Sequence, residues 1–323
     1  MDKIRWGIIG CGDVTEVKSG PGFQLTENSE LVAVMRRDSI LAEDYAKRHK
    51  ISKWYDDAQA LIDDPEVDAV YIATPPSSHK QYTQAVAKSG KPIYVEKPMA
   101  MSWAEAKEMV GICQQAKVPL FVAHYRRALP RFLKVKQLID KGRIGKVQFV
   151  NTQFYKPATE NDLKNDENWR VHPDISGCGY FCDLAPHMLD IIQYFLGDIT
   201  SVFGNQSNLA GLYPAEDTVS GQFMFASGAH GTGVWNFNAG IALDQTDIVG
   251  DQGKISFSIF GKEPIVLESI TSREEFPIVN PLHIQQPLIQ TIVDHLLGTG
   301  SCPTVAENVL ITSWVMDKML GRI

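Results

Sequence analysis

Three side chains of this sequence have the types and the spacing needed to move a proton on and off a hydroxyl group. Asp183 and His187 are four residues apart, so they share one face if a helix covers both positions. A carboxylate beside an imidazole fixes the ring tautomer and raises its basicity, which is typical of a general base. Lys97, in the stretch YVEKPMA (94–100), brings an ammonium group that can stabilise negative charge developing on an oxygen.

Each of these residues also has a plainer interpretation. Asp183 is a good helix N-cap, His187 is a candidate core histidine, and Lys97 before a proline is typical of a surface turn. A zinc site is a further alternative, with the ligand types Cys178, Cys182, Asp183 and His187. No second ligand pair accompanies that segment, so we expect no metal. The elements around the three side chains decide between these interpretations.

The first 123 residues alternate short apolar runs with amphipathic stretches. The apolar runs, predicted as strands, are residues 4–9, 31–35, 69–73, 92–95 and 118–123. The amphipathic stretches, predicted as helices, are residues 40–49, 58–62, 79–88 and 103–116. This alternation is typical of a doubly wound parallel sheet of the Rossmann type, covered on both faces. Ligands bind beyond the carboxyl ends of such strands, where Lys97 follows the fourth.

The pattern changes near residue 146 to an alternation of period two. The segments KVQFVNTQFY, DTVSGQFMFA, HGTGVWNFNA and GKISFSIF predict strands of a large, mostly antiparallel open sheet. Predicted helices cover residues 184–196, 287–297 and 306–320. We therefore expect an α/β protein with a dinucleotide-binding Rossmann domain (1–123) and an α+β domain for substrate binding and oligomerisation (124–303). The C-terminal helix (304–323) is expected to pack on the first domain.

A glycine turn follows the first predicted strand. In GIIGCGDVT (7–15), Gly10 permits a tight turn, and Gly12 lets the backbone approach a pyrophosphate at a helix N-terminus. Thr15 occupies the place of the third glycine of the GxGxxG pattern. The position of the turn between a strand and a helical stretch favours a dinucleotide site over a plain strand–helix turn.

The end of the second predicted strand bears on the choice of cofactor. A typical NAD site has an acidic residue there that binds the ribose, but this strand ends VMRRD, with Arg36 in that place and Arg37 beside it. Guanidinium groups suit a 2′-phosphate, so we expect NADP as the preferred cofactor and NAD as the alternative. Asp38 still offers a carboxylate to a ribose, and a solvated basic turn is the structural alternative.

Taken together, these motifs resemble those of the glucose-fructose oxidoreductase and inositol dehydrogenase family (Gfo/Idh/MocA). The resemblance covers nearly the whole chain and rests on GIIGCGDVT (7–15), VYIATPPSSH (70–79), KPIYVEKPMA (91–100), HYRRALP (124–130) and SGCGYFCDLAPHMLD (176–190). It implies an NAD(P)-dependent dehydrogenase or reductase acting on a secondary hydroxyl or keto group of a sugar, polyol or related cyclic alcohol. It also implies a homodimer or homotetramer paired through the open sheet of the second domain.

The motifs and the resemblance give a set of expected site residues. The expected catalytic residues are Lys97, Asp183 and His187. The expected cofactor-binding residues are Gly10, Gly12, Asp13, Val14, Arg36, Arg37, Thr74, Pro75, His79, Glu96 and Lys97. The expected substrate-binding residues are Lys18, Tyr125, Arg126, Trp169 and Arg170.

Several substrate assignments have alternatives. Trp169 can pack on the C–H face of a sugar and Arg170 can donate to hydroxyls, but the pair is also typical of a packed loop anchor. Lys18 lies in VKSGPG (17–22), where Gly and Pro interrupt the first helix, so we expect a loop there. A plain exposed lysine is the alternative at that position. Tyr125 stands where many members of the family have Asn.

Composition excludes several classes of protein. The chain has 323 residues, 44% hydrophobic and 21% charged, which indicates a globular protein of about two domains. A net charge of -7 argues against a general nucleic-acid binder. Five cysteines without a CxxC pair indicate reduced thiols. With no leader or long apolar run, we expect a cytoplasmic protein with no membrane partner.

Two other functions remain open at this point. An enzyme that retains NAD and cleaves glycosides through transient oxidation uses the same fold, although Arg36 and Arg37 argue mildly against it. A non-catalytic NADP-sensing protein would bind the cofactor without turnover. The joint presence of Lys97, Asp183 and His187 argues against that second alternative.

Overall fold

A computed structural model describes residues 2–163 and 168–323 of the chain. The contacts divide the chain into two compact units, one of Met1–Leu129 and Pro281–Leu310 and one of Pro130–Asn280 and Ile311–Ile323. They thus assign residues 281–310 to the first unit. The packing of the C-terminal helix (304–323) on the first domain stays a prediction. The expected division at residue 123 into independently folding domains stays a prediction.

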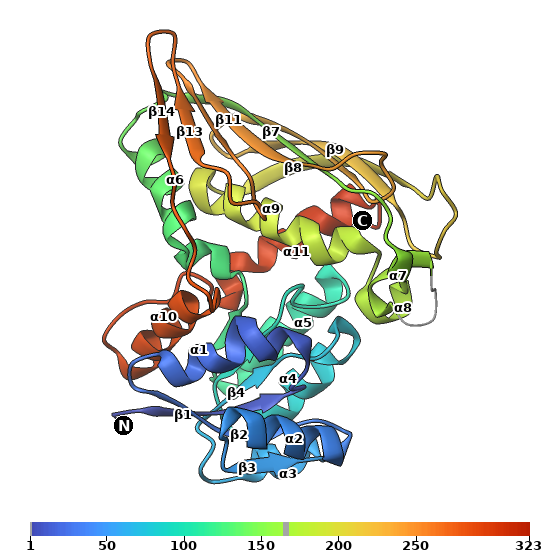
Figure 1. The fold of residues 1–323 in the computed structure, drawn as a ribbon, viewed down its shortest axis with the longest axis vertical. Helices are drawn as coiled ribbons and strands as arrows, with labels where there is room; N and C mark the ends of the chain where they lie inside the picture. Colours follow the sequence, from blue (N-terminus) through green and yellow to red (C-terminus); the bar gives the residue numbers. More distant parts are fainter. Residues whose placement is uncertain (1, 164–167) are drawn as a thin grey trace. The chain divides into compact units, whose positions relative to one another are not determined.

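The first unit contains a six-stranded parallel sheet with the order β3-β2-β1-β4-β5-β6 (Figure 1). Its strands are β1 (Ile4–Ile9), β2 (Ser29–Met35), β3 (Lys53–Tyr55), β4 (Ala69–Ile72), β5 (Ile93–Val95) and β6 (Leu120–Val122). The predicted Rossmann-type sheet is confirmed, and the strand order reverses between β1 and β4, where such folds bind ligands. β3 was missed because three residues, KWY, give no apolar run.

Except for α1, which was not predicted, the helices of the first unit lie close to their predicted bounds. They are α1 (Gly20–Leu25), α2 (Ser39–His49), α3 (Ala58–Asp63), α4 (His79–Lys88), α5 (Trp103–Ala116) and α10 (Gln286–Leu297). Asp38 caps α2 by accepting the backbone N–H of Leu41, and Ser102 caps α5 by accepting that of Glu105. The loop expected over residues 17–22 is wrong, because a π-helical turn η1 (Thr15–Ser19) leads directly into α1.

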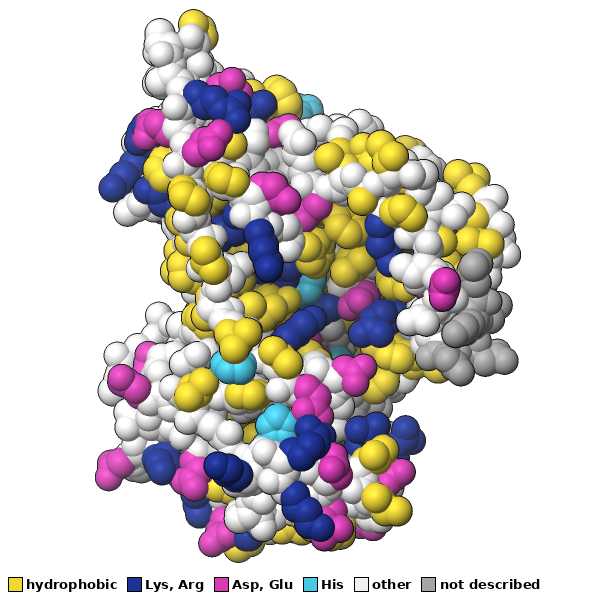
Figure 2. Space-filling model, viewed as in Figure 1, with side chains coloured by type: hydrophobic (Ala, Val, Ile, Leu, Met, Phe, Trp, Pro, Cys, Tyr) yellow, Lys and Arg dark blue, Asp and Glu magenta, His cyan; other side chains and the backbone are white. Residues whose placement is uncertain are grey.

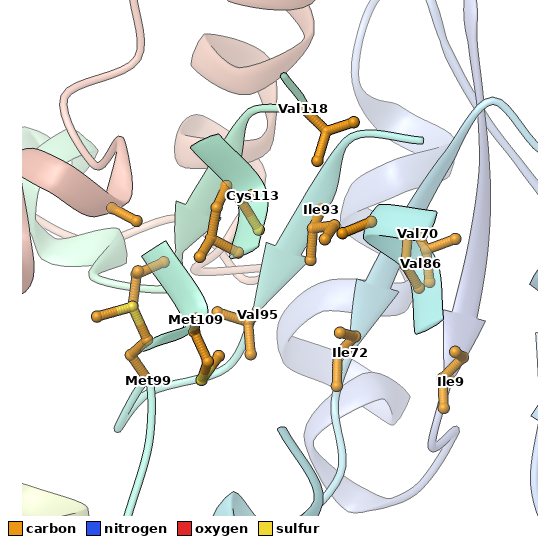
Figure 3. Packing of buried hydrophobic residues seen from close by; sticks show 14 of the residues in the cluster. Ile9, Val70, Ile72, Val86, Ile93, Val95, Met99, Met109, Cys113 and Val118 are labelled. Carbon is orange, nitrogen blue, oxygen red and sulfur yellow. The ribbon is translucent and has the colours of Figure 1, made fainter. Parts of the chain in front are cut away.

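The core of the first unit lies between the central strands and the helices α4 and α5. Figure 3 shows Val95 from β5 beside Met109 from α5, with Ile72 from β4 on the other side of Val95 and Cys113 one turn further along α5. These four side chains are at most 2% exposed. Burial of a side chain of this size contributes about 1.5–3 kcal/mol, so the packing fixes where the strands end. Lys97 therefore follows a strand that is held in place by the core.

The second unit contains an eight-stranded sheet with the order β14-β13-β12-β11-β7-β10-β9-β8. Its strands are β7 (Val147–Tyr155), β8 (Ile199–Ser207), β9 (Thr218–Phe225), β10 (His230–Asn236), β11 (Leu243–Gly250), β12 (Lys254–Phe257), β13 (Ile265–Glu268) and β14 (Arg273–Phe276). Neighbouring strands are antiparallel except β7 and β10, which pair in parallel, so the predicted mostly antiparallel sheet is confirmed. The sequence did not mark β8, β11, β13 and β14. β14 (REEF), for instance, is almost entirely polar.

The helices of the second unit lie on one face of this sheet (Figure 1). They are α6 (Pro130–Asp140), α7 (Glu160–Leu163), α8 (Pro173–Ser176), α9 (Tyr180–Leu196) and the part of α11 (Ala306–Met319) that follows Leu310. Figure 1 shows no helix of the described residues on the other face, which we call the open face. In β9, Val219 and Phe225 are 0% and 1% exposed, whereas Met224 is 39% exposed on the open face.

The surface carries charges of both signs. In the view of Figure 2, acidic and basic side chains are interspersed, as expected for a protein of modest net charge. Within residues 2–163 and 168–323, no helix has both the length and the apolar character that crossing a bilayer requires.

Candidate active site

The glycine turn after β1 has the geometry that its sequence predicts. Gly10 has a φ of +94°, and a Cβ atom there would lie 2.7 Å from Cγ2 of Thr74. A Cβ atom at Gly12 would have no described heavy atom within 4 Å, so the backbone is open to a ligand on that side. Asp13 and Val14 continue the turn as an exposed and a half-buried residue. These residues fit a pyrophosphate that approaches the backbone closely.

Thr15 stabilises the turn by hydrogen bonds and does not provide the close backbone approach that a third glycine would allow. Its Oγ1 donates to the carbonyl of Gly12 at 2.7 Å, and its own carbonyl accepts from the Tyr45 hydroxyl at 2.8 Å. The close approach that a third glycine would provide occurs at Gly20, where a Cβ atom would lie 2.3 Å from both Thr15 O and Tyr45 Oη. Pro21 follows in the first turn of α1, where its missing N–H is tolerated, so this GPG segment continues as a helix.

The two arginines after β2 differ in their surroundings. Arg36 is half-buried and donates from Nη1 to the carbonyl of Cys11 at 3.4 Å, which places its guanidinium group beside the glycine turn. Arg37 is exposed. The Asp38 carboxylate, the alternative ribose ligand, accepts the backbone N–H of Leu41 at 3.1 Å. Part of its hydrogen-bonding capacity is therefore used in capping α2.

His79 ties two loops of the expected cofactor site together. Its Nε2 lies 2.8 Å from the carbonyl oxygen of Thr74, and its Nδ1 lies 3.1 Å from that of Pro98 and 3.2 Å from that of Met99. The ring is fully buried, and desolvation lowers the pKa of His79. We therefore interpret His79 as a residue that positions the loop containing Thr74 and Pro75, since both ring nitrogens face protein carbonyl groups.

Lys97 follows β5, and the Lys97–Pro98 peptide bond is cis. The preceding Glu96 is 6% exposed, and its Oε2 accepts the backbone N–H of Lys97 at 3.1 Å. Its Oε1 accepts from the Tyr71 hydroxyl at 2.5 Å and from Nε2 of Gln285 at 2.6 Å. Glu96 thus contacts the Lys97 backbone directly, as an orienting residue would.

Gln285 completes this buried network, and sequence reasoning missed it. Its side chain is fully buried, and its Oε1 accepts from the Tyr94 hydroxyl at 2.7 Å. Its backbone N–H donates to the carbonyl of Lys18 at 3.1 Å. The side chain of Lys18 is exposed on η1. No local pattern marks Gln285, because its partners come from three other segments of the first unit.

Two further expected residues follow β6 in a short 3-10 helix, η3 (Tyr125–Ala128). Tyr125 and Arg126 are each 5% exposed, and the Arg126 guanidinium lies 5.0 Å from the centroid of the Tyr125 ring. The two residues therefore act as one packed unit. A direct contact of either residue with a substrate stays a prediction.

In the second unit, α9 carries two of the three predicted catalytic residues. The helix begins at Tyr180, four residues before the predicted start, and Gly179 is its N-cap. Asp183 lies in the first turn and His187 one turn later, so both share one face. The N-cap interpretation of Asp183 is wrong, because the cap lies four residues earlier. His187 is 4% exposed, and the Asp183 side chain is 18% exposed.

The loop before α9 brings two predicted substrate residues to Asp183. Trp169 and Arg170 belong to a 3-10 helix, η4 (Trp169–Val171), in which the Arg170 guanidinium lies 4.6 Å from the Trp169 ring. Arg170 donates from Nε to Oδ2 of Asp183 at 3.1 Å. The structure therefore joins Asp183, Arg170 and Trp169 in one cluster.

The second unit also contains a cavity of about 680 Å³. Its walls include Phe154, Lys156, Asp244, Phe257, Phe260 and Glu263. The ring of Phe260 lies 5.6 Å from that of His187, edge to face. The Lys156 ammonium lies 3.9 Å from the centroid of the Tyr180 ring, on the first residue of α9. Sequence reasoning missed both Lys156 and Phe260, although Lys156 directly follows a predicted strand.

The expectation that all cysteines are reduced thiols is wrong for two of them. Cys178 and Cys182 form a disulfide, with a Cα–Cα distance of 5.5 Å. A search for CxxC pairs missed this bond, because four-residue spacing across a helix start also brings two cysteines together. The bond removes both thiolates from the alternative zinc site. Cys11, Cys113 and Cys302 are free and buried. The cytoplasmic location stays a prediction.

Comparison with known proteins identifies the family. The family model described as "Oxidoreductase family, NAD-binding Rossmann fold" matches residues 4–124, and the "GFO/IDH/MocA C-terminal domain" matches residues 132–256. The chain is 41% identical over 320 residues to oxidoreductase P35 of Formosa agariphila, which covers 99% of both chains. The chain belongs to the GFO/IDH/MocA oxidoreductase family.

Two further proteins show how widely this architecture is shared. The 1,5-anhydro-D-fructose reductase of Ensifer adhaerens is 25% identical over 313 residues, covering 94% of this chain and 91% of that enzyme. The aldose-aldose oxidoreductase of Caulobacter crescentus, solved with glycerol, superposes with a TM-score of 0.87 at 21% identity. That superposition covers 99% of this chain and 97% of the other, and it shows the shared fold. The predicted family and fold are thus confirmed.

Proposed function

We propose that this family member is an NAD(P)-dependent dehydrogenase or reductase that acts on a secondary hydroxyl or keto group of a sugar, polyol or related cyclic alcohol. The observation that carries the proposal is the placement of Asp183 and His187 on one face of α9, with Arg170 held on Asp183 at 3.1 Å. The open backbone at Gly12, in an NAD-binding Rossmann fold, supports the cofactor assignment. The name of the Ensifer adhaerens relative, a reductase of an anhydro sugar, supports the substrate class.

In the direction of oxidation, the substrate loses a proton from oxygen and a hydride from carbon. The glycine turn around Gly10 and Gly12 would hold a nicotinamide cofactor, which would supply hydride transfer in either direction. His187 takes the hydroxyl proton, and its low exposure shields the transfer from bulk water. The Asp183 carboxylate stabilises the imidazolium that forms.

Lys97 stabilises the negative charge that develops on the reacting oxygen. Its backbone is held by Glu96, whose carboxylate accepts three hydrogen bonds from Tyr71, Gln285 and Lys97 itself. Two groups serve both the oxidation and the reduction: the base, which accepts the proton, and the cation, which stabilises the oxyanion. The same residues therefore serve a dehydrogenase and a reductase.

The test is turnover of a panel of aldoses, polyols and keto sugars with NADP(H) and NAD(H) by wild type, Lys97→Ala and His187→Ala. We expect turnover to fall about a hundredfold or more in each variant, the scale for losing a positioned acid–base group. Cofactor dissociation constants, measured by fluorescence, should stay within about threefold of wild type. Lys107→Ala, on the exposed face of α5, is the matched control and should leave turnover unchanged. Wild-type turnover in His187→Ala would overturn the assignment.

A further inference from the structure

Lys156 is a cation on the cavity wall of the second unit that the proposed chemistry does not use. It directly follows β7, is half-buried, and desolvation lowers the pKa of its ammonium. Its ammonium lies over the Tyr180 ring at 3.9 Å. Across residues 2–163 and 168–323, no carboxylate lies within ion-pair distance of it. A half-buried ammonium without a carboxylate partner among the described residues is available to donate hydrogen bonds to an anionic ligand.

The carboxylates around Lys156 accept hydrogen bonds from other groups. Asp162 accepts from the backbone N–H of Thr159 at 2.7 Å, from Nδ2 of Asn168 at 3.0 Å and from the Tyr180 hydroxyl. Asp183 accepts from Arg170. Both carboxylates are near enough to favour the charged form of Lys156, but neither is hydrogen-bonded to it.

The acids on the cavity wall are also used within the protein. Asp244 accepts the backbone N–H groups of Ile259, Phe260 and Gly261 at 2.9, 2.6 and 3.1 Å. Glu263 accepts from Ser258 Oγ at 2.9 Å. These bonds fix the loop that carries Phe260 and neutralise part of the negative charge. Lys156 therefore lies on this wall without an ion-pair partner among the described residues.

Arg170 provides a second positive charge at the same turn of α9, because it bonds Asp183 there while Lys156 lies over the ring of Tyr180. After desolvation, its charge is the other influence that lowers the pKa of the Lys156 ammonium, against the opposing charges of Asp162 and Asp183. Two like charges near one another are stabilised by an anion that contacts both. Arg170 uses Nε on Asp183, and its side chain remains 42% exposed.

The same cavity offers aromatic surface for a ring. Phe154 and Phe260 lie 5.1 Å apart between centroids, and Phe260 remains 37% exposed. Aromatic faces pack favourably on the C–H face of a sugar ring. A ligand that matches these features has a ring with an apolar face and a carboxylate on its edge.

We propose that the substrate is a sugar acid, a pyranose ring bearing a carboxylate, with the carboxylate bound by Lys156 and Arg170 and the ring packed on Phe154 and Phe260. This inference names the substrate class of the proposed oxidoreductase and rests on that function for the reaction. The arrangement puts the ring beside His187, which Phe260 contacts. A neutral hexose, with a hydroxymethyl group in place of the carboxylate, lacks the charge-assisted contact.

The test compares binding of D-glucuronate, D-galacturonate and D-mannuronate with D-glucose, D-galactose and D-mannose by calorimetry on the cofactor-loaded protein. Each pair differs only in the group attached to C5. We expect at least one acid to bind about 10- to 100-fold more tightly than its neutral partner, the scale of a charge-assisted bond. Lys156→Met should abolish that preference while leaving binding of the neutral hexose within about twofold. Lys156→Arg should restore most of it.

The matched control is Lys254→Met, which removes an equal charge from β12, where Lys254 pairs with Glu268 at 3.7 Å. It should bind the acids as wild type does, and thermal melting checks that each variant is folded. Equal binding of acids and neutral hexoses by wild type, or no binding of either at millimolar concentration, overturns the inference. An acid preference that depends on Lys156 without any turnover would instead uphold the inference and count against the proposed oxidoreductase reaction.

Discussion

At the residue scale, Arg36 governs the expected choice between NADP and NAD. Its guanidinium group lies at the glycine turn, 3.4 Å from the Cys11 carbonyl oxygen, where an acid would repel a 2′-phosphate. A charge-assisted bond is worth about 1.5–3 kcal/mol, so we expect NADP to bind about 10- to 100-fold more tightly than NAD. Arg36→Asp should reverse the preference. The measurement is the pair of cofactor dissociation constants by fluorescence.

Lys88→Asp serves as the control for Arg36→Asp. It makes the same change of charge at an exposed position in the last turn of α4. It should leave the preference for NADP unchanged within about twofold. Tighter binding of NAD than NADP by wild type would contradict the prediction. It would indicate that Asp38 binds the ribose of NAD.

Glu16 gives the first unit a pH-dependent contribution to stability. Hydrogen bonds from Arg48 and then from His49 lower the pKa of Glu16 from its ordinary value of 4.5 to about 2. Because the folded-state pKa is depressed, the contribution is present above about pH 4.5 and is lost as the pH falls toward 2. Glu16→Gln should lower the free energy of unfolding by about 1 kcal/mol at pH 7.

The measurement is urea unfolding of wild type and Glu16→Gln between pH 7 and pH 3. The difference in free energy should shrink steadily below about pH 4.5. Glu43→Gln, which removes a carboxylate from an exposed pair with Lys47, is the control and should change stability less. A difference that stays constant over the whole range would show that the Arg48 contact is not electrostatic.

At the element scale, the segment before α10 holds the first unit's helix and sheet together through Gln285. Its backbone contacts η1 at Lys18, and its side chain contacts Glu96 and Tyr94 behind β5. Gln285→Leu should lower the free energy of unfolding by about 1–3 kcal/mol, because Glu96 and Tyr94 lose a buried partner. Turnover should also fall, because the carboxylate behind Lys97 loses its position.

The measurement pairs urea unfolding with kcat and KM for Gln285→Leu. A positioning role predicts a lower kcat with little change in KM, whereas mere loss of stability leaves kcat of the folded fraction unchanged. Gln84→Leu, at an exposed position of α4, is the matched control and should behave as wild type in both measurements. An unchanged kcat in Gln285→Leu would restrict Gln285 to a structural role.

At the scale of the whole molecule, the open face of the eight-stranded sheet predicts a homo-oligomer. Phe149, Phe203, Met224 and Val234 are 46%, 62%, 39% and 42% exposed. Strand register puts them on one face, since Met224 pairs with His230 and His230 with Phe149. A monomer rarely leaves such apolar side chains wet, so we expect a dimer or tetramer.

The measurement is sedimentation at micromolar concentration, where we expect a multiple of 35.9 kDa for wild type. Phe149→Glu places a charge in the open face and should shift the equilibrium toward the monomer. Leu133→Glu, on α6 and 43% exposed, adds the same charge away from this face and should not. A wild-type monomer at this concentration would refute the predicted interface.

The sequence by itself determined the features that depend on neighbouring residues. The bounds of β1, α4 and α5 match their predictions, because apolar periodicity and terminal residues are local signals. Gly10 was predicted at a tight turn because a positive φ is a property of one residue. Asp183 and His187 were predicted on one face because a helix repeats every 3.6 residues.

Only the tertiary structure decided the contacts that join distant segments. Gln285 reaches Glu96, and Arg131 donates to Ser258 Oγ at 3.0 Å, through pairings that no local pattern specifies. Lys156 became a candidate ligand-binding residue only once Tyr180 and Arg170 were beside it. Such pairs depend on strand register and on the position at which the connection between two parallel strands rejoins the sheet. Both depend on the packing of the whole unit. Residue spacing therefore predicted the candidate catalytic residues, whereas packing decided which side chains surround them.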